Sequence, residues 1–143
     1  MNRFRIRNSR RFAWVGPPAV AISAAGVIAY VAQVDPSQAG SYPTCPFLAI
    51  TGWHCPGCGS LRMIHALAHG DLLDALSMNL FAVAMLPLLA FWFLRWTAES
   101  WGLRERSRTL AHPAWVWTLL VTVCAYWIAR NSPPTAFLAP GGW

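Results

Sequence analysis

Three long stretches without a charged residue constrain how this chain can fold. They run from Trp14 to Val34, from Ala75 to Leu94 and from Pro113 to Ala129. At 1.5 Å per residue, helices over these stretches are roughly 26–32 Å long, close to the hydrocarbon thickness of a bilayer. The chain is 56% hydrophobic and only 11% charged, too apolar for an ordinary soluble domain. We therefore expect one all-α membrane domain over residues 1–143, with three transmembrane helices at about 15–34, 75–95 and 113–130.

A cleavable signal peptide is the alternative explanation for the first stretch. The segment from Ser9 to Phe12 weakly resembles a twin-arginine signal, because two arginines precede the apolar run. The apolar region is long for a signal peptide, and no clear small-x-small cleavage site follows it. We favour a retained span, and both explanations give the chain the same orientation.

The arginines predict the orientation of the chain. All eleven basic residues are arginine, and nine of them lie either before the first stretch or in the segment 95–112. Because short cytoplasmic loops hold the excess of positive charge, we expect a multi-pass protein of the inner (plasma) membrane. Its amino terminus is then cytoplasmic, and its carboxyl terminus is extracytoplasmic. Arginines at the ends of spans contact anionic lipid, so this basic chain is not expected to bind nucleic acid.

Between the first two stretches, residues 60–69 have the pattern of a short amphipathic helix. Apolar and polar residues form neighbouring stripes at helical spacing. The apolar stripe is Leu61, Ile64 and Ala68, and the polar stripe is Arg62, His65 and His69. Ten residues are too few to cross a bilayer, so we expect an interfacial helix that lies in the headgroup region.

Further signals mark the borders and the middle of the second stretch. Gly70 ends the preceding helix, and Asp71 can cap the next one. Pro87 removes one backbone hydrogen bond inside the stretch, which predicts a kink one turn earlier, near Val83. The arginine-rich segment 95–112 that follows reads as a solvated loop or a short surface helix.

Three of the four cysteines lie in one fourteen-residue segment, from Cys45 to Cys58, of the predicted extracytoplasmic loop. An oxidising compartment favours a structural disulfide from Cys45 to Cys55 or Cys58. A zinc site is the second possibility, with all three thiols and His65 as the fourth ligand. The Cys-x-x-Cys spacing also suits a redox pair of Cys55 and Cys58, although no thioredoxin-like βαβ pattern surrounds it. Cys124 lies in the third stretch and reads as an ordinary small core residue.

Arg62 follows the cysteine turn directly and lies two helical turns before Asp71. Its guanidinium carries five donors in a fixed fork. These donors can hold the carbonyl groups of the loop or the carboxylate of Asp71. We therefore expect Arg62 and Asp71 to act as a structural clamp.

The two cysteine blocks resemble a family of small bacterial membrane proteins classed only as a domain of unknown function. The resemblance covers about residues 43–95 and rests on two cysteine blocks and on matching residues after them: Cys45-Pro46-Phe47, Cys55-Pro56-Gly57-Cys58-Gly59-Ser60-Leu61-Arg62, His69-Gly70-Asp71, Ala75 and Asn79. Leu61 stands where the family has threonine, and Leu80 stands where it often has proline. The resemblance implies an integral membrane protein and no established activity. Arginine without lysine, together with abundant Ala, Gly, Pro and Trp, suggests a GC-rich, actinobacterial genome.

Two classes of function stay open. The first is a membrane protein without identifiable catalytic activity, an accessory or assembly subunit whose outer loop is held by a disulfide or by zinc. The second is a membrane thiol–disulfide oxidoreductase, with Cys55 as nucleophile and Cys58 or Cys45 as resolving thiol. We favour the first, because the sequence has no paired-carboxylate site, phosphate-binding glycine loop or nucleophile–His–acid arrangement. Three spans bury little on their own, so we expect a membrane-protein partner or self-association besides lipid.

Overall fold

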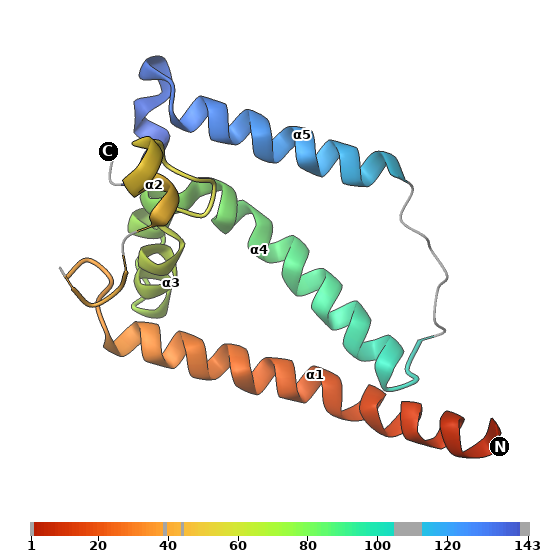
Figure 1. Ribbon diagram of the computed structural model, residues 1–143. Helices are drawn as coiled ribbons and strands as arrows, with labels where there is room; N and C mark the ends of the chain where they lie inside the picture. Colours follow the sequence, from red (N-terminus) through yellow and green to blue (C-terminus); the bar gives the residue numbers. More distant parts are fainter. Residues whose placement is uncertain (1, 39, 44, 105–112, 141–143) are drawn as a thin grey trace. The chain divides into compact units, whose positions relative to one another are not determined.

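The computed structural model describes residues 2–38, 40–43, 45–104 and 113–140. Within these ranges the chain forms helices, turns and irregular segments and no β-strand, which confirms the expected all-α class (Figure 1). The elements in order are α1 (Asn2–Gln33), α2 (Pro46–Thr51), α3 (Ser60–Ala68), α4 (Leu72–Ser100), α5 (Pro113–Arg130) and the 3-10 helix η1 (Pro133–Leu138).

Two helices of the described chain are long and apolar enough to cross a membrane. They are the segment Trp14–Gln33 of α1, with 20 residues, and α4, with 29 residues. The apolar part of α5, Ala114–Arg130, is shorter. The structure therefore has two candidate spans and one shorter apolar helix where the sequence predicted three spans.

The second apolar helix is longer than expected at its carboxyl end. Residues 95–100, expected in a loop or surface helix, continue α4, and there Arg95 Nε lies 2.9 Å from Glu99 Oε1 one turn later. This ion pair at i,i+4 spacing supports the extra turn. The remainder of the predicted loop includes residues 105–112, which lie outside the described residues.

The interruption of α4 is not where the proline predicted it. The non-helical residue is Asn79, with φ −159° and ψ 85°, and Pro87 lies in helical backbone. Asn79 is also almost fully buried, with 1% of its surface exposed. The side-chain contacts of Asn79, described below, account for this position of the kink.

The chain divides into two compact units, Met1–Val27 with Leu86–Arg108, and Ile28–Met85 with Thr109–Trp143. In the first unit, the rings of Trp14 and Trp101 stack with centroids 6.4 Å apart. Gly16 leaves room for the ring of Trp96 in the same unit, because a Cβ there would lie 3.2 Å from that ring. All the cysteines belong to the second unit.

The core of the second unit joins α3 to the start of α4. Met63 and Ala66 of α3 are buried against Ala75 of α4. The predicted apolar stripe of α3 is therefore only partly right, since Leu61 is 40% exposed and Ala68 is also exposed. The buried side of α3 is rotated toward Met63 and Ala66, because this side meets α4.

Aromatic side chains attach the cysteine loop to α5 in the same unit. The ring of Trp127 in α5 lies 5.7 Å from that of Phe47 in α2 and 5.9 Å from that of Trp53, both edge-on. Edge-to-face pairs of this kind stabilise packing beyond their buried area. The short helix α2 was not predicted, since six residues show too little periodicity to be recognised.

Candidate metal centre

Local backbone signals bring the two cysteine blocks into the same loop. Cys45 precedes α2, whose first residue is Pro46, a residue preorganised for a first helical turn. Gly52 ends α2 in the left-handed conformation, with φ 72°. The second block forms a tight turn in which the Cys58 N–H donates to the Cys55 carbonyl over 3.0 Å. The chain thus returns to Cys45 within one short helix and one turn.

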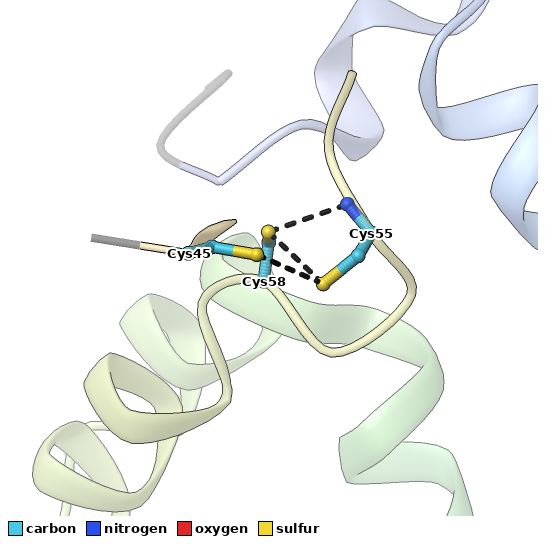
Figure 2. A group of neighbouring side chains, drawn as sticks. All are labelled: Cys45, Cys55 and Cys58. Atoms are coloured by element: carbon cyan, nitrogen blue, oxygen red, sulfur yellow. Dashed lines mark hydrogen bonds between the residues drawn. The ribbon is translucent and has the colours of Figure 1, made fainter. Parts of the chain in front are cut away.

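The three sulfur atoms of this loop converge on one point (Figure 2). Cys45 Sγ lies 3.7 Å from Cys55 Sγ, Cys55 Sγ lies 3.2 Å from Cys58 Sγ, and all three lie within 4.8 Å of one another. The cysteines are free thiols in this structure. Two thiolates on a tetrahedral zinc ion, each with a Zn–S bond of about 2.3 Å, are about 3.8 Å apart. The Cys45–Cys55 separation of 3.7 Å matches this value, and the Cys55–Cys58 separation of 3.2 Å is shorter, so a bound metal ion would spread this second pair.

The environment makes the three thiols unequal. Burial, followed by the hydrogen bond with Cys55, raises the pKa of Cys58 to about 12. The backbone N–H of Leu48 in the first turn of α2 lowers the pKa of Cys45. The Cys55 N–H also donates to Cys58 Sγ over 3.3 Å. Cys45 is thus the thiol that ionises more easily, and Cys58 is the one that needs a cation to do so.

A buried arginine at the end of α5 holds the turn through its backbone carbonyls. Arg130 is 1% exposed and donates to carbonyl oxygens of the turn and of α4. Its acceptors are Cys58 O at 2.8 Å, Met78 O at 3.0 Å, Pro56 O at 3.4 Å and Cys55 O at 3.5 Å. Its Nε has no hydrogen-bond partner in the described part of the chain, and its guanidinium carbon lies 5.6 Å from the Tyr126 ring centroid. No carboxylate within the described ranges forms an ion pair with Arg130.

Asn79 connects the same turn to α4 and α5. Its side-chain amide donates to Pro56 O at 3.0 Å, Ser60 Oγ at 3.2 Å and Cys58 O at 3.3 Å. Its side-chain oxygen accepts from the Ala82 N–H at 3.0 Å and from the Tyr126 hydroxyl at 3.2 Å. A buried amide with this many partners outweighs the helical preference of the backbone, which explains the break in α4 at this residue.

A second asparagine fixes the entry to the turn. The His54 N–H donates to Asn131 Oδ1 over 2.8 Å, and Asn131 Nδ2 donates to His54 O over 2.9 Å. Burial, and then the charge of Arg130, lower the pKa of the His54 imidazole. The backbone of the cysteine turn is therefore held by three side chains, two of them from the end of α5.

Gly59 lets the turn approach α4 closely. It has φ +83°, and a Cβ at this position would lie 2.4 Å from Met78 O. Only glycine tolerates both the left-handed backbone and this contact. The turn is thus packed directly on the backbone of α4.

Residues 45–93 match the family described as "Protein of unknown function (DUF2752)". The matched segment contains the three thiols, Gly59 and Asn79, whereas Arg130 and Asn131 lie beyond it. No curated protein and no solved structure matches the chain.

Of the site residues predicted besides the cysteines, none joins the sulfur group. The His65 Nδ1 lies 2.8 Å from Val31 O at the end of α1, and its ring contacts that of His69 in a tilted arrangement with centroids 4.4 Å apart. Cys124 is exposed on α5. Within residues 2–38, 40–43, 45–104 and 113–140, only Cys45, Cys55 and Cys58 form a group that can hold a metal ion.

The predicted clamp of Arg62 and Asp71 is also replaced by other contacts. Both residues are described, and no hydrogen bond or ion pair joins them. Asp71 caps α4 instead, with its Oδ1 accepting the Asp74 N–H over 2.9 Å. Arg62 is exposed, and the carbonyls of the turn are held by Arg130, which the sequence placed at the far end of a span. The available signal for Asn79 and Arg130 was a polar side chain at the border of an apolar stretch, where its burial costs most unless it is bonded.

Proposed function

We propose that this chain is a small multi-pass protein of a bacterial plasma membrane whose outer cysteine loop holds a zinc ion. Cys45, Cys55 and Cys58 are the proposed ligands. The observation that carries the proposal is the convergence of three free thiols whose sulfurs all lie within 4.8 Å of one another, close enough to ligate one metal ion. We propose the role of an accessory or assembly subunit, in which the metal fixes the shape of the outer loop.

The buried charge of Arg130 supports thiolate ligands. A cation that is 1% exposed and has no carboxylate partner in the described chain is costly unless a negative charge lies nearby. Three thiolates and one Zn²⁺ carry a net charge of −1, which would complement the guanidinium. The hydrogen bonds from Arg130 to the carbonyls of Cys55 and Cys58 would also orient these two ligands, as outer partners of metal sites do.

The contacts of the loop favour the proposed three-span topology. The end of α1 meets α3 at Val31, the start of α4 meets the turn at Asn79, and the end of α5 meets it at Arg130. With three spans, these three helix ends are on the same side of the membrane. The excess of arginine lies at the other ends, which favours an extracytoplasmic loop. Apolar side chains such as Ile22, Leu89 and Val121 are more than half exposed, as expected for helices in lipid.

Metal analysis of the full chain in detergent tests the proposal. We expect about one equivalent of zinc per chain after purification without reductant or chelator, and we expect Cys45→Ser, Cys55→Ser or Cys58→Ser to abolish it. The matched control is Cys124→Ser, which removes an exposed thiol outside the group and should retain the metal. Absence of bound metal from the wild-type protein would contradict the site. Loss of metal from the Cys124→Ser control would also contradict it.

A thiol–disulfide oxidoreductase is the second candidate, because Cys55 Sγ and Cys58 Sγ lie only 3.2 Å apart. In this reaction two thiols form one disulfide and release two protons and two electrons, which a quinone or a disulfide of a partner protein would accept. Intact-mass measurement separates the candidates. The redox function predicts an air-oxidised chain lighter by two hydrogen atoms, and a Cys58→Ser variant trapped as a mixed disulfide through Cys55. The metal site predicts reduced thiols that become reactive only after chelation.

A further inference from the structure

The sulfur group forms part of the wall of a cavity of about 480 Å³. The lining includes all three cysteines, Tyr42, His54 and Arg62. Cys58 is buried, while Cys45 and Cys55 are only half-buried. The sulfurs therefore face a space that a small molecule can enter, within the size range of ligand pockets.

Three protein thiolates leave one position of a tetrahedral metal for another donor. No further His, Cys, Asp or Glu of the described ranges joins the group of three. A metal held in this way can thus take its fourth donor from the cavity. A soft donor fits best, because a thiolate set selects a thiophilic metal, which in turn prefers sulfur.

The lining of the cavity also carries a cation. Arg62 is exposed and is the only arginine among the described residues of the lining, none of which is Asp or Glu. Asp35 interacts electrostatically with this arginine, and its Oδ1 accepts the Ser37 N–H over 2.8 Å. The guanidinium fork of Arg62 matches the two oxygens of a carboxylate.

We propose that the cavity binds a low-molecular-weight thiol that carries a carboxylate. This inference rests on the proposed metal site. The sulfur of the ligand binds the metal as the fourth donor, its thiol proton passes to solvent, and no electron is transferred. The carboxylate pairs with Arg62. Arg62 is then a residue that binds the ligand in this cavity, whereas Arg130 holds the backbone of the cysteine turn.

Cobalt-loaded full-length protein in detergent provides the test, because tetrahedral Co²⁺ reports its ligands in the visible spectrum. We would titrate 3-mercaptopropionate, 2-mercaptoethanol and propionate, and follow bound cobalt by dialysis. We expect 3-mercaptopropionate to change the ligand-field bands at the lowest concentration, with the cobalt retained. Arg62→Gln should weaken 3-mercaptopropionate roughly tenfold or more and leave 2-mercaptoethanol unchanged.

The outcomes distinguish this inference from the metal site. Failure of the wild-type chain to bind cobalt would overturn both. Bound cobalt whose spectrum does not respond to either thiol would overturn the inference and keep the metal site. Equal affinity for the two thiols, or no effect of Arg62→Gln, would show that Arg62 does not bind the carboxylate, and would overturn the inferred ligand class. A cobalt spectrum altered by His54→Gln without added thiol would assign the fourth position to that histidine and overturn the inference.

Discussion

Arg130 places a permanent positive charge inside the second unit, where its only described acceptors are backbone carbonyls. Replacing it by Met leaves these carbonyls without their donor, and we expect a loss of about 3–5 kcal/mol in the free energy of unfolding. Arg130→Lys keeps the charge but cannot reach all the acceptors, so it should lie in between. Arg62→Met, at an exposed arginine, is the control and should change stability little. Unfolding by SDS in mixed micelles measures the stability of all three variants. Equal losses of stability in Arg130→Met and Arg62→Met would contradict the role of Arg130 in holding the turn.

Two glycines separate backbone strain from close packing. Gly59 and Gly70 have φ of +83° and +80°, but a Cβ at Gly59 would meet Met78 O, whereas a Cβ at Gly70 would have no described atom within 4 Å. Gly70→Ala should therefore cost about 1–2 kcal/mol from the left-handed backbone alone. Gly59→Ala should cost about 2 kcal/mol more, because the backbone of α4 must move. Thermal midpoints in detergent compare the two variants, and similar midpoints would show that the turn does not press on α4.

Thiol reactivity in the metal-free, reduced protein should follow the two opposite pKa shifts. The lowered pKa of Cys45 predicts that iodoacetamide modifies it first as the pH rises, and Cys58, raised from 9.0 to about 12, should be modified last. The folded state holds the Cys58 proton more tightly than the unfolded state does. Its contribution to stability is thus complete below pH 9 and is lost as the pH rises toward 12. Peptide mapping after timed alkylation measures the order, and modification of Cys58 before Cys45 would contradict it.

The sequence was enough to predict which sulfurs gather, and not what holds them. Cys45, Cys55 and Cys58 are close in the chain, so a turn joins them at little entropic cost. Arg130 and Asn131 reach the turn across more than seventy residues, and the sequence contains no pattern that pairs them with the turn. The nearer arginine, Arg62, was therefore assigned the clamp.

The break in helix α4 depends on the side-chain amide of Asn79. Asn79→Asp places a carboxylate oxygen against the carbonyls of Pro56 and Cys58, so we expect it to destabilise the chain by about 2–4 kcal/mol. Tyr126→Phe removes a single hydrogen bond to the same side chain and should cost about 1 kcal/mol. SDS unfolding compares the two, and a smaller loss in Asn79→Asp than in Tyr126→Phe would contradict the role of the amide.

The long helices could be predicted because each needs only an apolar run. The apolar parts of α1, α4 and α5 follow from the three uncharged stretches, and α3 follows from its helical spacing, whereas the start of α1 at Asn2 lies well before its predicted start near residue 15. The kink could not be placed in the same way. Pro87 lacks an N–H but can stay in a helix that yields slightly, while the contacts of Asn79 depend on a turn that is distant in sequence.

The proposed topology predicts the side of the membrane on which each loop and terminus lies. Reporters fused after Val34 and after Trp143 should be extracytoplasmic, and a reporter after Arg104 should be cytoplasmic, because nine of eleven arginines lie on that side. Paired alkaline phosphatase and green fluorescent protein fusions provide opposite readouts at each position. A cytoplasmic signal from the carboxyl-terminal fusion would rule out three spans with this orientation.

The bonds between His54 and Asn131 also set an order of events during synthesis. The two residues are 77 positions apart. At a translation rate of about 5–20 residues per second, the ribosome reaches the second roughly 4–15 s after the first. Throughout that interval the three cysteines have been synthesised, but Asn131, which bonds to the backbone of the cysteine turn, has not. A nascent chain stopped before Asn131 would therefore expose the cysteine loop without these two hydrogen bonds.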